Sequence, residues 1–235
     1  MKKFETIDSK SISDTVLATL QGRILSGELK AGEWLPPERE MAEQMGVSRG
    51  SLHQAILSLE YQGFVSSVPR RGTVVCDYRK NPTPQSLAAI MSYGSPELDK
   101  GIFSDMMDFR MWLEAECARR ACSNIYESTL FQMRSIAMNL GKQESDLTEE
   151  TFRFHYLLTQ ASGNSVFSMI FRGFEPAVKA LTGYRYEVGD TDISLTRKQM
   201  LDLVDSIAAK DEDEAENKLR VLLGHGIGQI EARYK

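Results

Sequence analysis

The hydrophobic positions of the first third of the chain predict three helices followed by two short strands. Apolar side chains recur every fourth residue from Ile12 to Ile24, which indicates an amphipathic helix over about 11–26 with Ser11 at its start. The Pro36-Pro37 pair leads into a second, short helix, EREMAEQM. After a third helix, the segments FVSSVP and TVVCDY lie around a glycine-bearing turn and indicate a β-hairpin.

The third helix, within MGVSRGSLHQAILSLEYQGFV, has two distinct faces. Gly46 breaks the preceding helix, and Ser48 is placed to cap the new one. Four apolar side chains at helical spacing face a core: Leu52, Ala55, Ile56 and Leu59. Arg49, Gly50 and His53 are three and four residues apart, so they project together from another face. The order of elements is that of a winged helix-turn-helix, whose third helix enters a DNA groove; packing inside a small α/β domain is the alternative.

Beyond the hairpin the chain first becomes polar and then almost wholly helical. Prolines interrupt 79–102, which we interpret as a linker with one short helix, SLAAIMSYG. From residue 103 onward, apolar positions three and four apart recur between short polar breaks, which predicts a bundle of six or seven helices. The first of these helices has a face expected to be buried: Phe109, Leu113, Cys117 and Ala121. The predicted fold is therefore mainly α, with a winged helix-turn-helix over 1–78 and an all-α bundle over 103–235.

Composition narrows the class of protein but does not select a partner. The chain has 42% hydrophobic and 26% charged residues, as expected of a globular protein. Its polar start lacks the apolar run of a secretory signal, and no stretch of about 18 apolar residues predicts a membrane span. The three cysteines lack zinc-ribbon spacing and are expected to be reduced structural thiols of a cytoplasmic protein. Because the net charge is −5, DNA binding would require a local basic patch.

The segment over 27–75 closely resembles the DNA-binding domain of GntR-family bacterial transcription regulators. The matching motifs are G-x-L-x-x-G-x-x-L-P, E-R-E-x-A, G-V-S-R, A-x-x-x-L-x-x-x-G and P-x-R-G-T-x-V, in that order. The bundle resembles the effector-binding (FCD) domain of the FadR-like subgroup, mainly in D-F-R-M-W-L-E-A-E-C-A-R-R-A and F-H-Y-L-L-T-Q-A-S-G-N. The resemblance implies DNA contacts from nine residues: Arg39, Ser48, Arg49, Gly50, Ser51, His53, Arg70, Arg71 and Gly72.

These DNA contacts differ in their expected roles. An arginine can bind a phosphate or donate hydrogen bonds to both O6 and N7 of guanine. We expect Arg39 and Arg49 to make contacts of this kind. The hydroxyls and backbone amides at the start of the third helix would bind phosphate, and Arg70 and Arg71 would form a basic wing tip that reaches a minor groove. The family commonly has arginine at the position of His53, so we expect a different base preference here; an exposed histidine without a DNA contact is the alternative.

Many bundles of this subgroup bind a divalent metal with one aspartate and three histidines. Of these positions only His155 is retained, because the others are occupied by Thr151, Met200 and Leu222. His225 lies one helical turn after the last position, so His155 and His225 are the remaining candidate ligands. A divalent site needs at least three good ligands, and we therefore expect no metal and no other cofactor.

A metal-free, acyl-CoA-binding branch of the subgroup is also similar near the C-terminus, in L-G-H-G-I-G-Q-I. Gly226 and Ile227 replace polar residues of that branch, and Glu231 replaces an aromatic one, so the ligand class stays open. For a small anionic metabolite we expect six effector-binding residues: Arg110, His155, Asn164, Tyr186, Arg220 and His225. Arg110 has an internal ion pair with Glu114 as its alternative role. Arg185 is expected at the surface or in packing, and the acidic run DEDEAE is expected to be the solvated start of the last helix.

The leading hypothesis is a ligand-responsive regulator that binds a pseudo-palindromic operator as a homodimer, without a membrane partner. A regulator that senses carboxylates through a metal is one alternative. A hydrolase built on the helical domain, without a DNA role, is another. The chain contains no H-E-x-x-H, P-loop or dinucleotide fingerprint, so we do not expect an enzyme.

Overall fold

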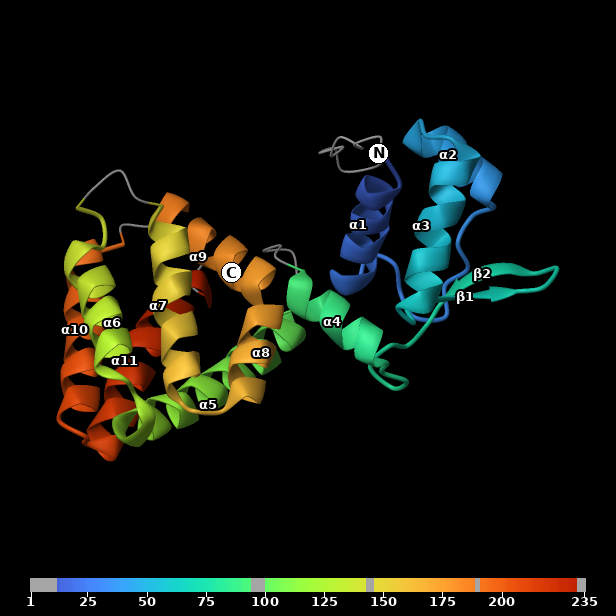
Figure 1. Cartoon of the computed structure of the whole chain (residues 1–235). Coiled ribbons are helices and arrows are strands. Elements are labelled where there is room, and N and C mark those ends of the chain that lie inside the picture. The colour runs from blue at the N-terminus through green and yellow to red at the C-terminus, as the bar shows by residue number, and fades with distance from the viewer. Residues whose placement is uncertain (1–11, 94–99, 143–145, 189–190, 232–235) are drawn as a thin grey trace, which may run out of the picture. The chain divides into compact units, whose positions relative to one another are not determined.

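The computed structural model describes residues 12–93, 100–142, 146–188 and 191–231. The described chain forms two compact units, which divide between Ile90 and Met91. The first unit contains three helices, a β-hairpin and most of a fourth helix, and the second is a bundle of seven helices (Figure 1). The expected fold class, mainly α with a winged helix-turn-helix and an all-α bundle, is confirmed.

The core of the first unit forms between α1 (Ile12–Leu25) and α3 (Arg49–Tyr61), with α2 (Glu38–Met45) packed on α3. The buried face of α1 consists of Val16, Leu20, Ile24 and Leu25. The apolar face of α3 is buried as its spacing predicts, because Leu52, Ala55, Ile56 and Leu59 are each at most 1% exposed. The expected role of Ser11 at the start of α1 lies outside the described residues.

A two-stranded antiparallel hairpin forms the wing. In it, β1 (Val65–Val68) pairs with β2 (Gly72–Val75), with Val65 opposite Val75. Trp34, in the loop after α1, adds an isolated bridge to Val74, so the loop covers one edge of the hairpin. Figure 1 shows the tip of the hairpin extending away from the three helices of its unit.

The short helix expected after the hairpin is α4 (Pro84–Ser92). Thr83 caps its start, accepting from the backbone N–H of Ser86 at 2.9 Å, while the Ser86 hydroxyl accepts from the N–H of Thr83 at 2.8 Å. This reciprocal pair satisfies two of the N–H groups that a helix start leaves without partners. The side chain of Gln21 on α1 donates to the carbonyl oxygen of Ala89 at 3.2 Å, which ties this part of α4 to the first unit.

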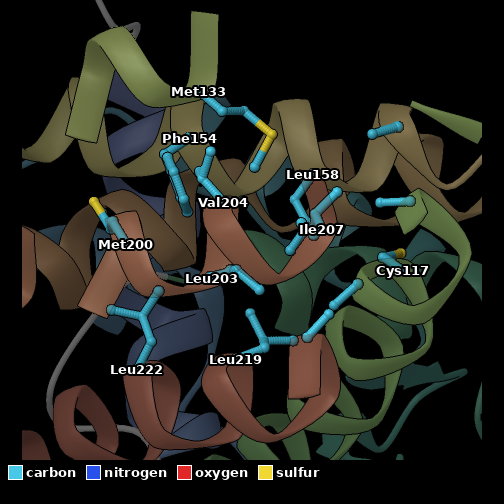
Figure 2. Packing of buried hydrophobic residues seen from close by; sticks show 14 of the residues in the cluster. Cys117, Met133, Phe154, Leu158, Met200, Leu203, Val204, Ile207, Leu219 and Leu222 are labelled. Atoms are coloured by element: carbon cyan, nitrogen blue, oxygen red, sulfur yellow. The ribbon is translucent and has the colours of Figure 1, made fainter. Parts of the chain in front are cut away.

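Seven helices make up the second unit. Their bounds are α5 (Lys100–Asn124), α6 (Glu127–Asn139), α7 (Leu147–Ala161), α8 (Ser165–Gly173), α9 (Glu175–Val188), α10 (Ile193–Ala208) and α11 (Glu212–Glu231). Buried side chains from α5, α6, α7, α10 and α11 meet in one cluster, of which Figure 2 shows Cys117, Met133, Phe154, Leu203 and Leu219. The three cysteines are free thiols, and burial raises the pKa of Cys117 to about 12.

Two expectations for the bundle are corrected. Leu113, Cys117 and Ala121 are buried, but Phe109 is 38% exposed and its ring lies beside Trp112 and Phe174. A spacing of four residues advances by about 40° per step on a helix of 3.6 residues per turn, so Phe109 has rotated away from the core face. The acidic start of α11 is also not simply solvated, because Arg119 on α5 forms ion pairs with Glu212, Asp213 and Glu216.

Candidate DNA-binding surface and effector cavity

The start of α3 is an exposed, capped helix N-terminus. Ser48 is the N-cap, and its Oγ accepts a hydrogen bond from the backbone N–H of Ser51 at 3.0 Å. Arg49, Gly50 and His53 are exposed on the side of α3 opposite its buried face. A helix N-terminus with free backbone amides attracts phosphate, and the neighbouring arginine adds a full positive charge.

A glycine makes the sharp turn that separates α3 from α2. Gly46 ends α2 in the left-handed region, at φ 65°, where side chains other than glycine are strained. Val47 donates its backbone N–H to the carbonyl oxygen of Ala42 at 3.0 Å, so the chain leaves α2 without an unpaired amide. The chain therefore turns sharply between the two helices, and Arg49, Gly50 and His53 of α3 remain exposed.

Two side chains from α2 contribute to the same surface. Glu38, at the start of α2, lies 3.1 Å from Nδ1 of His53, so it fixes the orientation of the imidazole on α3. Arg39 is exposed and pairs with Glu43 one turn later, at 3.0 Å. Surface pairs of this kind contribute little energy, so Arg39 can exchange its partner for a phosphate.

The wing tip presents two arginines. Arg70 lies in the left-handed region at φ 63°, which forms the tight turn, and Gly72 follows at φ 109°. The guanidinium of Arg71 lies 5.1 Å from the centre of the Trp34 ring, and this cation–π contact steadies it. Arg70, Arg71 and Gly72 are all exposed.

The second unit contains a partly enclosed cavity inside the bundle. It has an empty volume of about 450 Å³, its open mouth included. Its walls come from α5, α7, α9, α10 and α11, and the polar lining residues are Arg110, Thr151, His155, Thr182, Arg185 and Thr196. Met200 and Leu222, which lie at one end of the buried cluster, are part of the apolar lining (Figure 2).

A buried carboxylate organises one wall of this cavity. Glu114 is fully buried; its Oε1 accepts from Nε of Arg110 at 2.6 Å, and its Oε2 lies 2.5 Å from Nδ1 of His155. Burial alone would raise the pKa of Glu114, but the charges and hydrogen bonds of His155 and Arg110 lower it to about 2. Arg110 thus forms the internal ion pair with Glu114 that was its alternative role, and it also lines the cavity.

Arg185 is a cavity residue that sequence reasoning placed elsewhere. It is only 9% exposed and lines the cavity from α9, with Nη2 donating to Oγ1 of Thr196 at 3.0 Å. Beside it, the hydroxyl of Tyr186 lies 2.8 Å from Oγ1 of Thr151, so Tyr186 supports a lining residue. Burial raises the pKa of the Tyr186 hydroxyl.

Four of the six expected effector residues lie outside the lining: Tyr186, which supports Thr151, and Asn164, Arg220 and His225. Asn164 is the N-cap of α8, where its Oδ1 accepts from the N–H of Val166 at 3.0 Å. Arg220 is exposed and pairs with Glu216 at 2.8 Å. Nδ1 of His225 is buried and has no hydrogen-bond partner among the residues that the structure describes. The cavity therefore brings together only Arg110 and His155 from the expected set, with Tyr186 behind them.

Two family models match consecutive parts of the chain. The model described as "Bacterial regulatory proteins, gntR family" matches residues 12–75, and the FCD domain matches residues 105–225, more than half of the chain. The chain belongs to the GntR family. The FCD match spans the helices that surround the cavity, and the GntR match spans α1 to the wing.

Curated relatives of this GntR-family protein are regulators. The putative L-lactate dehydrogenase operon regulatory protein of Escherichia coli is 26% identical over 88% of this chain and 81% of its own length. The HTH-type transcriptional regulator LutR of Bacillus subtilis is 29% identical over 61% of this chain and 64% of its own length. The two family matches make this protein a transcription regulator with an FCD domain rather than a hydrolase.

Solved structures have the same fold. A Listeria monocytogenes protein, described as "Lar controls the expression of the Listeria monocytogenes agr system and mediates virulence", has a TM-score of 0.64 at 18% identity. It covers 97% of this chain and 100% of its own. Escherichia coli McbR/YncC has a TM-score of 0.54 at 17% identity, with 97% and 100% of the two chains covered.

The donor set of this GntR-family cavity does not fit a divalent metal ion. Thr151, His155, Met200 and Leu222, which the resemblance places at the metal-ligand positions, all line the cavity. Only one of them has an imidazole, and its Nδ1 is already next to Glu114. Within the described part of the chain, no group of three His, Cys, Asp or Glu side chains is placed to bind a metal. No helix in the described residues has the length and apolar character that a membrane span requires.

Proposed function

We propose that the protein binds a pseudo-palindromic operator as a homodimer and that a small anionic metabolite in the bundle cavity changes its affinity for DNA. The observation that supports this best is the division of α3 into a buried apolar face and an exposed face at a capped N-terminus. This geometry suits a helix that enters the major groove while its opposite face remains in the protein core. Because its proposed partner is chromosomal DNA, we place the protein in the bacterial cytoplasm.

In this proposal the exposed residues divide into base-reading and positioning groups. Arg49 and His53 face base edges, and Glu38 holds the imidazole of His53 in place. The hydroxyls of Ser48 and Ser51 and the amide of Gly50 bind phosphate at the helix N-terminus, together with Arg39. The wing residues Arg70, Arg71 and Gly72 contact the minor groove.

The bundle supplies the features that a dimer and an effector site need. Large apolar side chains are exposed on it, among them Trp112 at 56%, Phe131 at 73% and Met169 at 70%, and they offer a surface for a second copy. The cavity carries two arginines, which suit a carboxylate or phosphate group. One relative is named for an L-lactate dehydrogenase operon, so L-lactate is a reasonable first probe.

The experiment is a fluorescence anisotropy titration of the full chain against duplex DNA from the region upstream of its own gene. Arg49→Ala is compared with Arg23→Ala, which removes the same charge from an exposed arginine of α1 outside the proposed surface. We expect Arg49→Ala to weaken binding roughly tenfold or more and Arg23→Ala to leave it nearly unchanged. Equal losses in both variants would refute the assignment of α3 to the groove.

A further inference from the structure

The walls of the bundle cavity carry an excess of positive charge. Guanidinium groups line it from α5 (Arg110) and α9 (Arg185), and no acidic side chain lines it among the residues that the structure describes. Glu114, buried behind Arg110, uses one carboxylate oxygen for Arg110 and the other for His155. Arg110, Arg185 and Glu114 together carry a net charge of +1, before any charge on His155 is counted.

The guanidinium of Arg185 is held in the cavity by two specific neighbours. Thr196 accepts a hydrogen bond from its Nη2 at 3.0 Å. Gly226 leaves room for the group, because a Cβ at that position would lie 3.4 Å from Nη1 of Arg185. A side chain at 226 would therefore lie directly against the guanidinium of Arg185, in van der Waals contact with it.

The electrostatic surroundings of Arg185 favour a bound anion. Burial lowers the pKa of Arg185, and the charge of Arg110 lowers it further. An anion near both guanidinium groups would offset the repulsion between them and replace part of the lost hydration. The threonine hydroxyls of the lining at 151 and 182 can donate hydrogen bonds to the same anion, whereas that of Thr196 donates to the carbonyl oxygen of Asp192 at 3.3 Å.

We propose that Arg185 binds the carboxylate of a small organic acid in this cavity, in the role that a divalent metal ion has in metal-binding members of the family. The inference rests on the proposed function, in which this cavity is the effector site. A guanidinium offers two parallel N–H donors that match a carboxylate, and it needs none of the ligands that Thr151, Met200 and Leu222 fail to supply.

The size and apolar side of the cavity restrict the rest of the ligand. The empty volume of the cavity, with its open mouth included, is about 450 Å³. The apolar lining residues, among them Leu181, Leu223 and Ile227, suit a short carbon chain. A long acyl chain joined to a nucleotide exceeds this space, so the class is a small carboxylic acid rather than an acyl-CoA.

The test is isothermal titration calorimetry on the full chain after treatment with EDTA and removal of the chelator. The probes are L-lactate, succinate and inorganic phosphate, and lactamide serves as the uncharged match to lactate. We expect a carboxylate to bind without metal, lactamide to fail, and Arg185→Gln to weaken carboxylate binding roughly tenfold to a hundredfold. Arg220→Gln, which removes an exposed arginine of α11, is the matched control and should bind as the wild type does.

A second variant guards against a folding defect in Arg185→Gln. Arg185→Lys keeps the charge but not the paired donors, so we expect weakened binding with unchanged helical content by circular dichroism. Carboxylate binding that appears only after addition of Mn²⁺ or Zn²⁺ and survives Arg185→Gln would overturn the role of Arg185, while leaving an anion-responsive regulator intact. If no probe releases or absorbs heat, with or without metal, the inference is overturned and the anionic effector is removed from the proposed function. The DNA titration tests the role of α3 separately.

Discussion

The buried carboxylate of Glu114 provides a quantitative test of how the cavity wall is held together. Glu114 is fully buried, and each of its oxygens contacts a different positively charged or polar partner, Arg110 and His155. Glu114→Gln keeps the size of the side chain but removes the charge that balances Arg110. We therefore expect the second unit to become less stable at neutral pH, although little space is created.

The expected magnitude follows from the pKa. Burial opposes the ionised form of Glu114, but His155 and Arg110 outweigh it and lower the pKa from 4.5 to about 2. That difference corresponds to about 3 kcal/mol of unfolding free energy, which matches the usual cost of breaking a buried ion pair. Because the folded carboxyl binds a proton less readily than the unfolded one, this contribution is complete above pH 4.5 and disappears as the pH falls to about 2.

The assay is urea unfolding followed by the fluorescence of one tryptophan. The chain has two tryptophans, so a Trp34→Phe background leaves Trp112, on α5 in the second unit, as the reporter. Glu114→Gln should lower the unfolding free energy by about 3 kcal/mol at pH 7, and the difference from the parent should shrink between pH 4.5 and pH 3.

A surface pair on the same helix provides the control. Glu116 pairs with Arg120 at 2.7 Å, and both side chains are more than a third exposed, so Glu116→Gln should cost less than about 0.5 kcal/mol. A loss at Glu114 no larger than at Glu116, or a loss of about 3 kcal/mol that stays constant down to pH 3, would refute the reasoning.

Two further predictions concern local chemistry. Ser48→Ala should lower the unfolding free energy of the first unit by about 1 kcal/mol, because the N–H of Ser51 loses its acceptor, and Ser48→Asp should restore the stability. Urea unfolding in a Trp112→Phe background measures both variants. A Ser48→Ala variant as stable as its parent would contradict the capping role. Cys117 should resist alkylation by iodoacetamide at pH 8, because burial raises its pKa to about 12, whereas the partly exposed Cys76 should react first. Mass spectrometry of the digested protein distinguishes the two cysteines. Equal labelling of both would contradict the buried position of Cys117.

The elements of the first unit could be predicted because their signals are local. Ser48 before an apolar stripe, Gly46 at the end of α2 and the glycine of the wing turn each act within a few residues. The buried face of α3 follows from helical spacing alone. The contact between Glu38 and His53 could not be predicted in this way, because it joins side chains 15 residues apart on two helices and depends on how these helices cross.

The cavity shows where sequence reasoning fails. Arg185 and Arg220 look alike as arginines on amphipathic helices, yet one is buried and the other pairs with Glu216 at the surface. The pairing of Arg220 could have been read from its i−4 spacing to Glu216, and the capping role of Asn164 from its position before an apolar run. The inward direction of Arg185 has no local signal, since the groups beside its guanidinium, Thr196 and Gly226, lie on other helices.

The most direct test of the central claim is the salt dependence of DNA affinity in the wild type, Arg49→Ala and Arg23→Ala. Each phosphate neutralised by an arginine releases counterions, so the logarithm of the association constant should fall linearly with the logarithm of salt concentration. If the exposed face of α3 contacts DNA, Arg49→Ala should bind more weakly at every salt concentration, and a phosphate contact would make its slope shallower by about 1. Identical affinities and slopes for all three proteins, or an affinity that does not depend on salt, would contradict the account.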